Sequence, residues 1–213
     1  MDGLLVDSEP VWTLAETELA ERYGARWTAE VKAECVGRAL PDAVTRMLRS
    51  FGAPVGESVA AQAFLLTRMV ELFHGALPLR PGAGRLLDAL AEEAVPLALV
   101  SSSYRVLVDA ALDTLGGWRF AVSVAGDEVG HTKPHPEPYL AATGRLGVDP
   151  ARCVVVEDSP AGIAAGEAAG CVVVGVPDHA ALIAAATRPV VASLEDVDAR
   201  WLLGLPGRLR RAG

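Results

Sequence analysis

The sequence has few cysteines, and they form no zinc-binding pattern, which narrows the kinds of protein it can encode. Its 213 residues contain three cysteines, far apart, with no Cys-x-x-Cys pair and no metal-ligand spacing to the four histidines. A disulfide framework and a zinc finger are therefore not indicated. Because Cys153 and Cys171 stand beside strand-like apolar runs, we expect them to be buried, reduced thiols.

Long hydrophobic runs and excess positive charge are also missing. No apolar segment reaches the roughly 18 residues that suggest a membrane span, and Met1–Leu4 shows no basic region ahead of an apolar stretch, as a signal peptide would. The formal net charge of −8 gives a nucleic-acid partner no general electrostatic support. We expect a cytoplasmic monomer without membrane or nucleic-acid partners, although a few local cations can still hold an anionic ligand.

Hydrophobic residues, in contrast, make up 51% of the chain, and in its second half they gather in short β-branched runs. Continuous runs of this kind are typical of strands buried on both faces of a parallel sheet. The predicted strands are 96–100, 152–156, 171–176 and 189–191. Helical segments alternate with them, at about 82–94, 104–115, 136–146 and 160–169. This alternation predicts an α/β fold with a doubly wound parallel sheet.

The first third of the chain has helical composition and no convincing strand. The predicted helices are 12–23, 29–36, 42–51 and 58–74. Two prolines and a glycine at 78–82 interrupt helix and mark a boundary. We expect a small α-helical domain over 11–78, inserted into a core domain made of 1–10 and 79–213.

Polar residues follow the predicted strands at the edge where open α/β sheets bind ligands. Ser101-Ser102-Ser103 follows the first of these strands and could simply cap a helix, since serine is a favoured N-cap. Glu157-Asp158 follows the next strand and precedes Ser-Pro-Ala-Gly. Lys133 stands in the string Lys-Pro-His-Pro-Glu-Pro, where a lysine is usually only solvated. Asp2-Gly3 opens the chain and could be an ordinary turn.

Taken in order, these four strings resemble the signature motifs of the haloacid dehalogenase superfamily. The resemblance implies a Rossmann-like core with a helical cap. It makes Asp2 the general acid/base, and this position favours phosphate over halide chemistry. It also makes Lys133 a catalytic residue that neutralises the bound phosphate. Ser101 and the backbone N–H of Ser102 would bind the phosphoryl group. Mg²⁺ would be held by Asp158, by Glu157 directly or through water, and by the backbone carbonyl of Asp2, oxygen ligands of the kind this ion prefers.

One element of the first motif is not in the 213 residues. In the family, an aspartate two positions before the acid/base attacks phosphorus, and it would stand immediately before Met1. We expect that the natural protein begins upstream and that Met1 is an internal methionine. The alternative is a pseudoenzyme.

The expected function is Mg²⁺-dependent hydrolysis of a small, sugar-phosphate-like phosphomonoester through an aspartyl-phosphate. Arg38 lies in a Gly-Arg-x-x-x-Asp string that resembles the specificity loop of the cap, so it could bind the substrate, or it could be an ordinary surface arginine. β-Phosphoglucomutase-type transfer is an alternative, disfavoured because Leu40 stands where the mutase has an arginine. The second alternative is a non-catalytic module that binds a phosphate ester.

Overall fold

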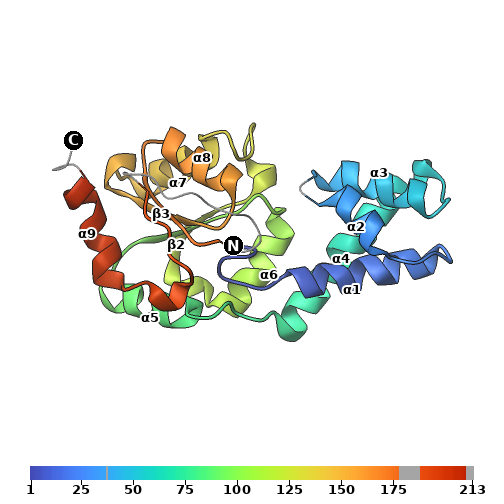
Figure 1. Ribbon diagram of the computed structural model, residues 1–213, viewed down its shortest axis with the longest axis horizontal. Helices are drawn as coiled ribbons and strands as arrows, with labels where there is room; N and C mark the ends of the chain where they lie inside the picture. The colour runs from blue at the N-terminus through green and yellow to red at the C-terminus, as the bar shows by residue number, and fades with distance from the viewer. Residues whose placement is uncertain (37, 178–187, 210–213) are drawn as a thin grey trace. The chain divides into compact units, whose positions relative to one another are not determined.

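The computed structural model describes residues 1–36, 38–177 and 188–209. The chain divides into two compact units, one formed by residues 1–7 and 78–213 and the other by residues 8–77. Within the described residues, no helix is both long and apolar enough to cross a membrane. Figure 1 shows the elements of both units with the labels used below.

The unit of residues 8–77 is entirely helical. Its helices are α1 (Glu9–Arg22), α2 (Ala29–Cys35), α3 (Leu40–Ser50), the short 3-10 helix η1 (Val55–Glu57) and α4 (Ser58–Ala76). On α4, Leu65, Met69 and Phe73 recur every four residues and are fully buried, because this spacing puts them on one face of a helix. Helix α4 packs against α1 and α3 through this unit's core. The four predicted helices are confirmed to within a few residues.

The other unit alternates strands and helices. Its strands are β1 (Leu97–Val100), β2 (Phe120–Val124), β3 (Val154–Glu157) and β4 (Val172–Gly175). Its helices are α5 (Ala83–Glu92), α6 (Arg105–Leu115), α7 (Glu137–Leu146), α8 (Pro160–Ala168) and α9 (Ala199–Leu209), with 3-10 turns η2 (Gly117–Arg119), η3 (Gly126–Glu128), η4 (Pro150–Arg152) and η5 (Leu194–Asp196). Helix α8 contacts β3 and β4, whereas α9 contacts β3 and α5. In Figure 1, α8 and α5 lie on opposite sides of the strands, as in a doubly wound α/β fold.

The strands pair in parallel, as the sequence predicts, but in two separate pairs. Leu99 of β1 is in register with Ser123 of β2, and Val155 of β3 is in register with Val173 of β4. Among the described residues, no strand joins β1 to β3. A cavity of about 400 Å³ lies there instead, lined mainly by apolar side chains of these two strands, of α5 and of the N-terminal segment.

Three expectations about individual segments need correction. Strand β2 was not predicted, because its Phe-Ala-Val-Ser-Val sequence is only partly buried and lacks a continuous β-branched run. The predicted strand at 189–191 is reduced to one isolated bridge between Val190 and Gly175. Cys153 and Cys171 are free thiols but only half-buried, because each precedes the buried part of its strand. Their partial burial raises the pKa of both, that of Cys171 to about 11.

Candidate functional site

Asp2 lies beside the serine turn that follows β1. Its Oδ2 atom accepts a hydrogen bond from the Ser103 hydroxyl at 2.9 Å and a longer one from the Ser101 hydroxyl at 3.5 Å. Ser101 is buried, and its backbone N–H donates to the Val124 carbonyl of the neighbouring strand at 3.0 Å. Two segments about 100 residues apart in sequence therefore place a carboxylate and two hydroxyls together.

The serine turn is shaped by a glycine packed against it. A Cβ atom at Gly126 would lie 2.2 Å from the Ser102 carbonyl oxygen, so a side chain at this position would displace the turn. The Ser103 N–H donates to the Ser101 hydroxyl at 3.1 Å, which closes the turn locally. Helix α6 begins only at Arg105, with Tyr104 as its N-cap residue. The simpler interpretation of the serines as helix caps is therefore wrong, and the hydroxyls of Ser101 and Ser103 contact Asp2 instead.

Lys133 and Glu157 meet at the end of β3. The Lys133 ammonium donates to the Glu157 carboxylate and, at 3.2 Å, to the Val100 carbonyl at the end of β1. Both side chains are almost completely buried. Lys133 thus lies next to the residue that precedes Ser101, and the usual solvated role of a loop lysine does not apply.

The Glu157 carboxylate is surrounded by donors. Oε1 accepts from Lys133 and from the Tyr139 hydroxyl at 2.7 Å. Oε2 accepts from the Asp158 N–H at 3.1 Å, from the Ser159 N–H at 3.2 Å and from the Ser159 hydroxyl at 3.0 Å. A carboxylate has about four lone-pair sites, so these donors occupy its acceptor capacity.

The Ser-Pro-Ala-Gly string after Asp158 explains how this arrangement is held. The Ser159 hydroxyl accepts the Gly162 N–H at 3.0 Å and caps helix α8. A Cβ atom at Gly162 would lie 2.0 Å from the Glu157 side chain. Glycine is therefore required at this position for the Glu157 carboxylate to lie against the first turn of α8.

Burial and charge shift the acidity of these groups in different directions. Burial acts to raise the pKa of Glu157, but the charge and the hydrogen bond of Lys133 oppose it and hold the pKa below its usual value. Burial, assisted by the charge of Glu157, raises the pKa of Tyr139 well above its usual value. Burial is also the main reason that the pKa of Asp158 is raised, and the charge of Glu157 adds to this effect. Glu157 is thus ionised and Tyr139 neutral at neutral pH.

The oxygen groups at this strand edge are of the type that binds Mg²⁺. Because the Glu157 carboxylate is occupied by five donors, its contact with an ion would run through water, whereas Asp158 is the carboxylate better suited to direct contact. In the part of the chain that the structure describes, the side chains of Asp2, Glu157 and Asp158 do not form a group whose ligand atoms all lie within 4.8 Å. Such a group consists of side-chain atoms alone, whereas the ligand predicted for Asp2 is its backbone carbonyl oxygen.

Two predicted substrate residues, Ser102 and Arg38, are exposed. Ser102 is exposed on the serine turn. Arg38 belongs to the helical unit, where it is exposed between α2 and α3, and its Nε donates to the Glu34 carbonyl at 2.7 Å.

Sequence reasoning missed three residues that contact the predicted ones. Ser103 is the stronger partner of Asp2, Tyr139 is a buried partner of Glu157, and Ser159 both caps α8 and holds Glu157. The signal for Ser159 was present in Ser-Pro-Ala-Gly, a typical helix start. No sequence signal separates Ser103 from Ser101, because only the turn geometry decides which hydroxyl reaches Asp2.

Comparison with known proteins gives concordant results. A model of the haloacid dehalogenase-like hydrolase family matches residues 1–170. Hexitol phosphatase A of Escherichia coli (strain K12) is 36% identical over 177 residues, which are 83% of this chain and 80% of that protein. The bifunctional riboflavin kinase/FMN phosphatase of Arabidopsis thaliana is 33% identical over 83% of this chain, and the match spans only 47% of its length.

A solved structure shows the same fold. The crystal structure of CbbY from Rhodobacter sphaeroides in complex with phosphate superimposes with a TM-score of 0.75, at 26% identity and 92% coverage of both chains. The fold, the order of the four motifs and the match over residues 1–170 agree. The chain therefore belongs to the haloacid dehalogenase-like hydrolases, and within that family it is a phosphoric monoester hydrolase.

Proposed function

We propose that this protein hydrolyses a small, sugar-phosphate-like phosphomonoester in a Mg²⁺-dependent reaction through an aspartyl-phosphate. The observation that carries the proposal is the contact of the Asp2 carboxylate with Ser103 and Ser101 at the end of β1. Lys133 reaches the same strand end through the Val100 carbonyl. An acid/base group, hydroxyl donors and a cation thus converge where this class of sheet binds its ligands.

In the proposed reaction, a carboxylate oxygen of the aspartate that would precede Met1 forms a bond to phosphorus as the ester P–O bond breaks. Asp2 donates its proton to the leaving oxygen, which departs as an alcohol. The Asp2 carboxylate then takes a proton from a water molecule, and the water oxygen bonds to phosphorus as the P–O bond to the nucleophilic aspartate breaks. Phosphate is released, the nucleophile returns to a carboxylate and Asp2 is again protonated. The Ser103 hydroxyl supports this cycle because it holds one Asp2 oxygen in place.

Negative charge develops on the phosphoryl oxygens during this reaction, and hydrogen-bond donors and a cation of this chain stabilise that charge. Lys133 supplies a buried positive charge, and the Ser101 hydroxyl and Ser102 N–H supply hydrogen bonds. Asp158, the Asp2 carbonyl and, through water, Glu157 would hold Mg²⁺, which when bound supplies electrostatic stabilisation of the same oxygens.

The substrate class is proposed from the relatives and from the helical unit. Hexitol phosphatase A is named for a phosphorylated sugar alcohol. We assign the helical unit the role of a cap, with Arg38 as a contact to the substrate, because its guanidinium is exposed and suited to anions. The partner in this proposal is a small phosphorylated metabolite.

The test measures Mg²⁺-dependent phosphate release from a panel of small phosphomonoesters, including hexitol phosphates, by two chains. One is the 213-residue chain, and the other carries an added apolar strand that ends in aspartate directly before Met1. We expect release by the extended chain alone, with loss on Asp2→Asn or on replacement of the added aspartate by asparagine. Release by the 213-residue chain that Asp158→Ala abolishes would show that another group attacks phosphorus. Phosphate binding without turnover by the extended chain would favour a binding module.

A further inference from the structure

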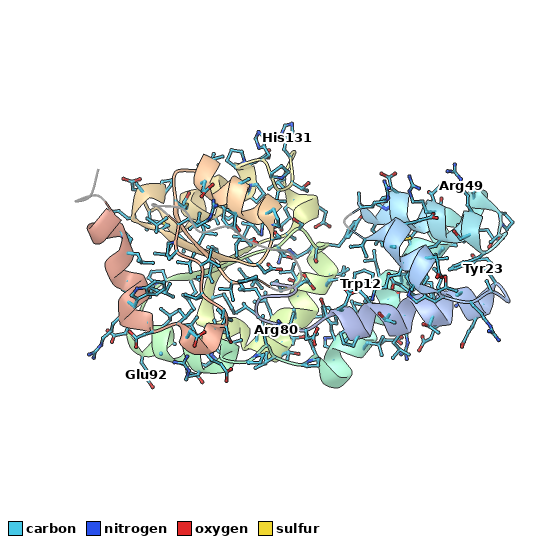
Figure 2. All side chains as sticks on the ribbon, in the orientation of Figure 1. Trp12, Tyr23, Arg49, Arg80, Glu92 and His131 are labelled. Atoms are coloured by element: carbon cyan, nitrogen blue, oxygen red, sulfur yellow. The ribbon has the colours of Figure 1, made fainter. Side chains whose placement is uncertain are left out.

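Two histidines of the loop between η3 and α7 converge with a glutamate at the start of α7. Each of His131, His135 and Glu137 offers one ligand atom, and these atoms all lie within 4.8 Å of one another. The two imidazole rings face each other with centroids 4.5 Å apart and planes tilted by 32°. Figure 2 shows His131 projecting outward from this loop. Among the described residues this is the one such group.

Backbone contacts hold the glutamate in place. Glu137 is the first residue of α7, and its carboxylate accepts the Gly130 N–H at 2.7 Å and the His131 N–H at 3.0 Å. The ring Nδ1 of His131 lies 2.9 Å from Glu137 Oε2, and the ring Nδ1 of His135 lies 3.2 Å from the Glu137 N–H. The loop therefore brings its three donor side chains together before any ligand binds.

The cluster is accessible, and its surroundings suit a cation. The side chains of His131 and His135 are 69% and 50% exposed. The lysine between them, Lys133, turns inward to Glu157 and is almost completely buried, so its ammonium does not share the exposed face of the loop. Backbone hydrogen bonds, chiefly from Gly130, lower the pKa of Glu137, which keeps the carboxylate ionised.

We propose that His131, His135 and Glu137 form a binding site for a divalent transition metal of the Zn²⁺, Ni²⁺ or Cu²⁺ class. Imidazole nitrogen is a ligand that these ions prefer, whereas Mg²⁺ prefers oxygen ligands alone. Three protein ligands would leave a position of a tetrahedral site open to water or an anion. The site is separate in ligand type from the oxygen cluster at the end of β3, although both depend on the loop that carries Lys133.

The site is tested by calorimetric titration of the 213-residue chain with Zn²⁺ in the presence of excess Mg²⁺. We expect one equivalent of Zn²⁺ to bind, and His131→Ala or His135→Ala to weaken binding by at least about tenfold. Two control variants test whether the loss of Zn²⁺ affinity is specific to these histidines. His74→Ala removes an exposed histidine of the helical unit, and Asp158→Asn removes a carboxylate of the oxygen cluster. Neither variant should change the Zn²⁺ affinity.

A second measurement reports the ligands directly. Co²⁺ bound to the chain should give visible absorption bands that disappear in the His131→Ala/His135→Ala double variant. Zn²⁺ binding that survives this double variant, or that is lost in Asp158→Asn instead, would overturn the proposal. Because both readouts measure binding, the outcome does not depend on whether the chain hydrolyses a phosphate ester.

Discussion

Lys133 and Glu157 form an ion pair in which both side chains are almost completely removed from solvent, with 8% and 5% exposure. The lysine comes from the proline-rich loop and the glutamate from the end of β3, so the pair joins two segments 24 residues apart. Removal of one partner should destabilise the protein more than removal of both, because a single charge would then remain buried without compensation.

Lys133→Met should therefore destabilise the fold by about 3–5 kcal/mol, and Lys133→Met/Glu157→Gln should recover part of that loss. The free energy of unfolding from urea denaturation measures both effects. Arg200→Ala, which removes an exposed side chain 3.4 Å from Glu93, is the control and should cost less than about 1 kcal/mol. Equal losses for Lys133→Met and Arg200→Ala would contradict the view that burial makes the pair important.

Gly162→Ala should destabilise the protein by about 1–3 kcal/mol, because its new Cβ would meet the Glu157 side chain. Gly144→Ala is the matched control on helix α7, where no atom lies within 4 Å of the new Cβ. Since alanine is the better helix former, this control should stabilise the protein by about 0.5–1 kcal/mol. Thermal unfolding of the two variants should shift in opposite directions, and a stabilising Gly162→Ala would refute the predicted clash.

Glu16 on α1 should make the fold less stable as the pH rises. Burial, assisted by Glu9 and opposed by Lys32, raises the pKa of Glu16 from 4.5 to about 7. Its Oε2 atom is buried without a hydrogen-bond partner among the described residues. Because the folded state holds this proton more tightly, the contribution of Glu16 is fully favourable below about pH 4.5. It is lost as the pH rises through about 7.

Glu16→Gln should accordingly be more stable than the unsubstituted protein at pH 8, by up to about 3 kcal/mol, and similar to it at pH 4.5. Urea denaturation at the two pH values measures the difference. Glu21→Gln removes an exposed carboxylate from the same helix and should show no such pH-dependent gain. A Glu16→Gln difference that stays constant between the two pH values would contradict the raised pKa.

The cavity between β1 and β3 should accept an additional parallel strand. Both strands line it, together with the buried side chains of Met1, Leu4 and Leu5. An apolar strand added before Met1 should fill the space, bury apolar surface and raise the melting temperature by several degrees. A Gly/Ser extension of equal length is the control, since it supplies no apolar side chains. Equal melting temperatures for the two extended chains would count against the predicted strand.

Much of the architecture followed from local patterns. The valine-rich segments at β3 and β4 predicted parallel strands, and the helical composition of the first third predicted its helices. These predictions succeeded because short runs of β-branched residues favour strands, whereas longer segments of helix-forming residues favour helices. Strand β2 was missed because its partly exposed Phe-Ala-Val-Ser-Val sequence has no such pattern.

The sequence by itself determined most of the elements, their order and the strings of polar residues that follow the strands, because these depend on neighbours in the chain. Only the tertiary structure decided that Ser103 rather than Ser101 is the nearer partner of Asp2, and that Tyr139 and Ser159 complete the shell around Glu157. It also decided that His131, His135 and Glu137 converge on one loop. These contacts depend on the path of each turn in space, since hydrogen bonds and metal ligands require positions defined to a fraction of an ångström that sequence spacing does not specify.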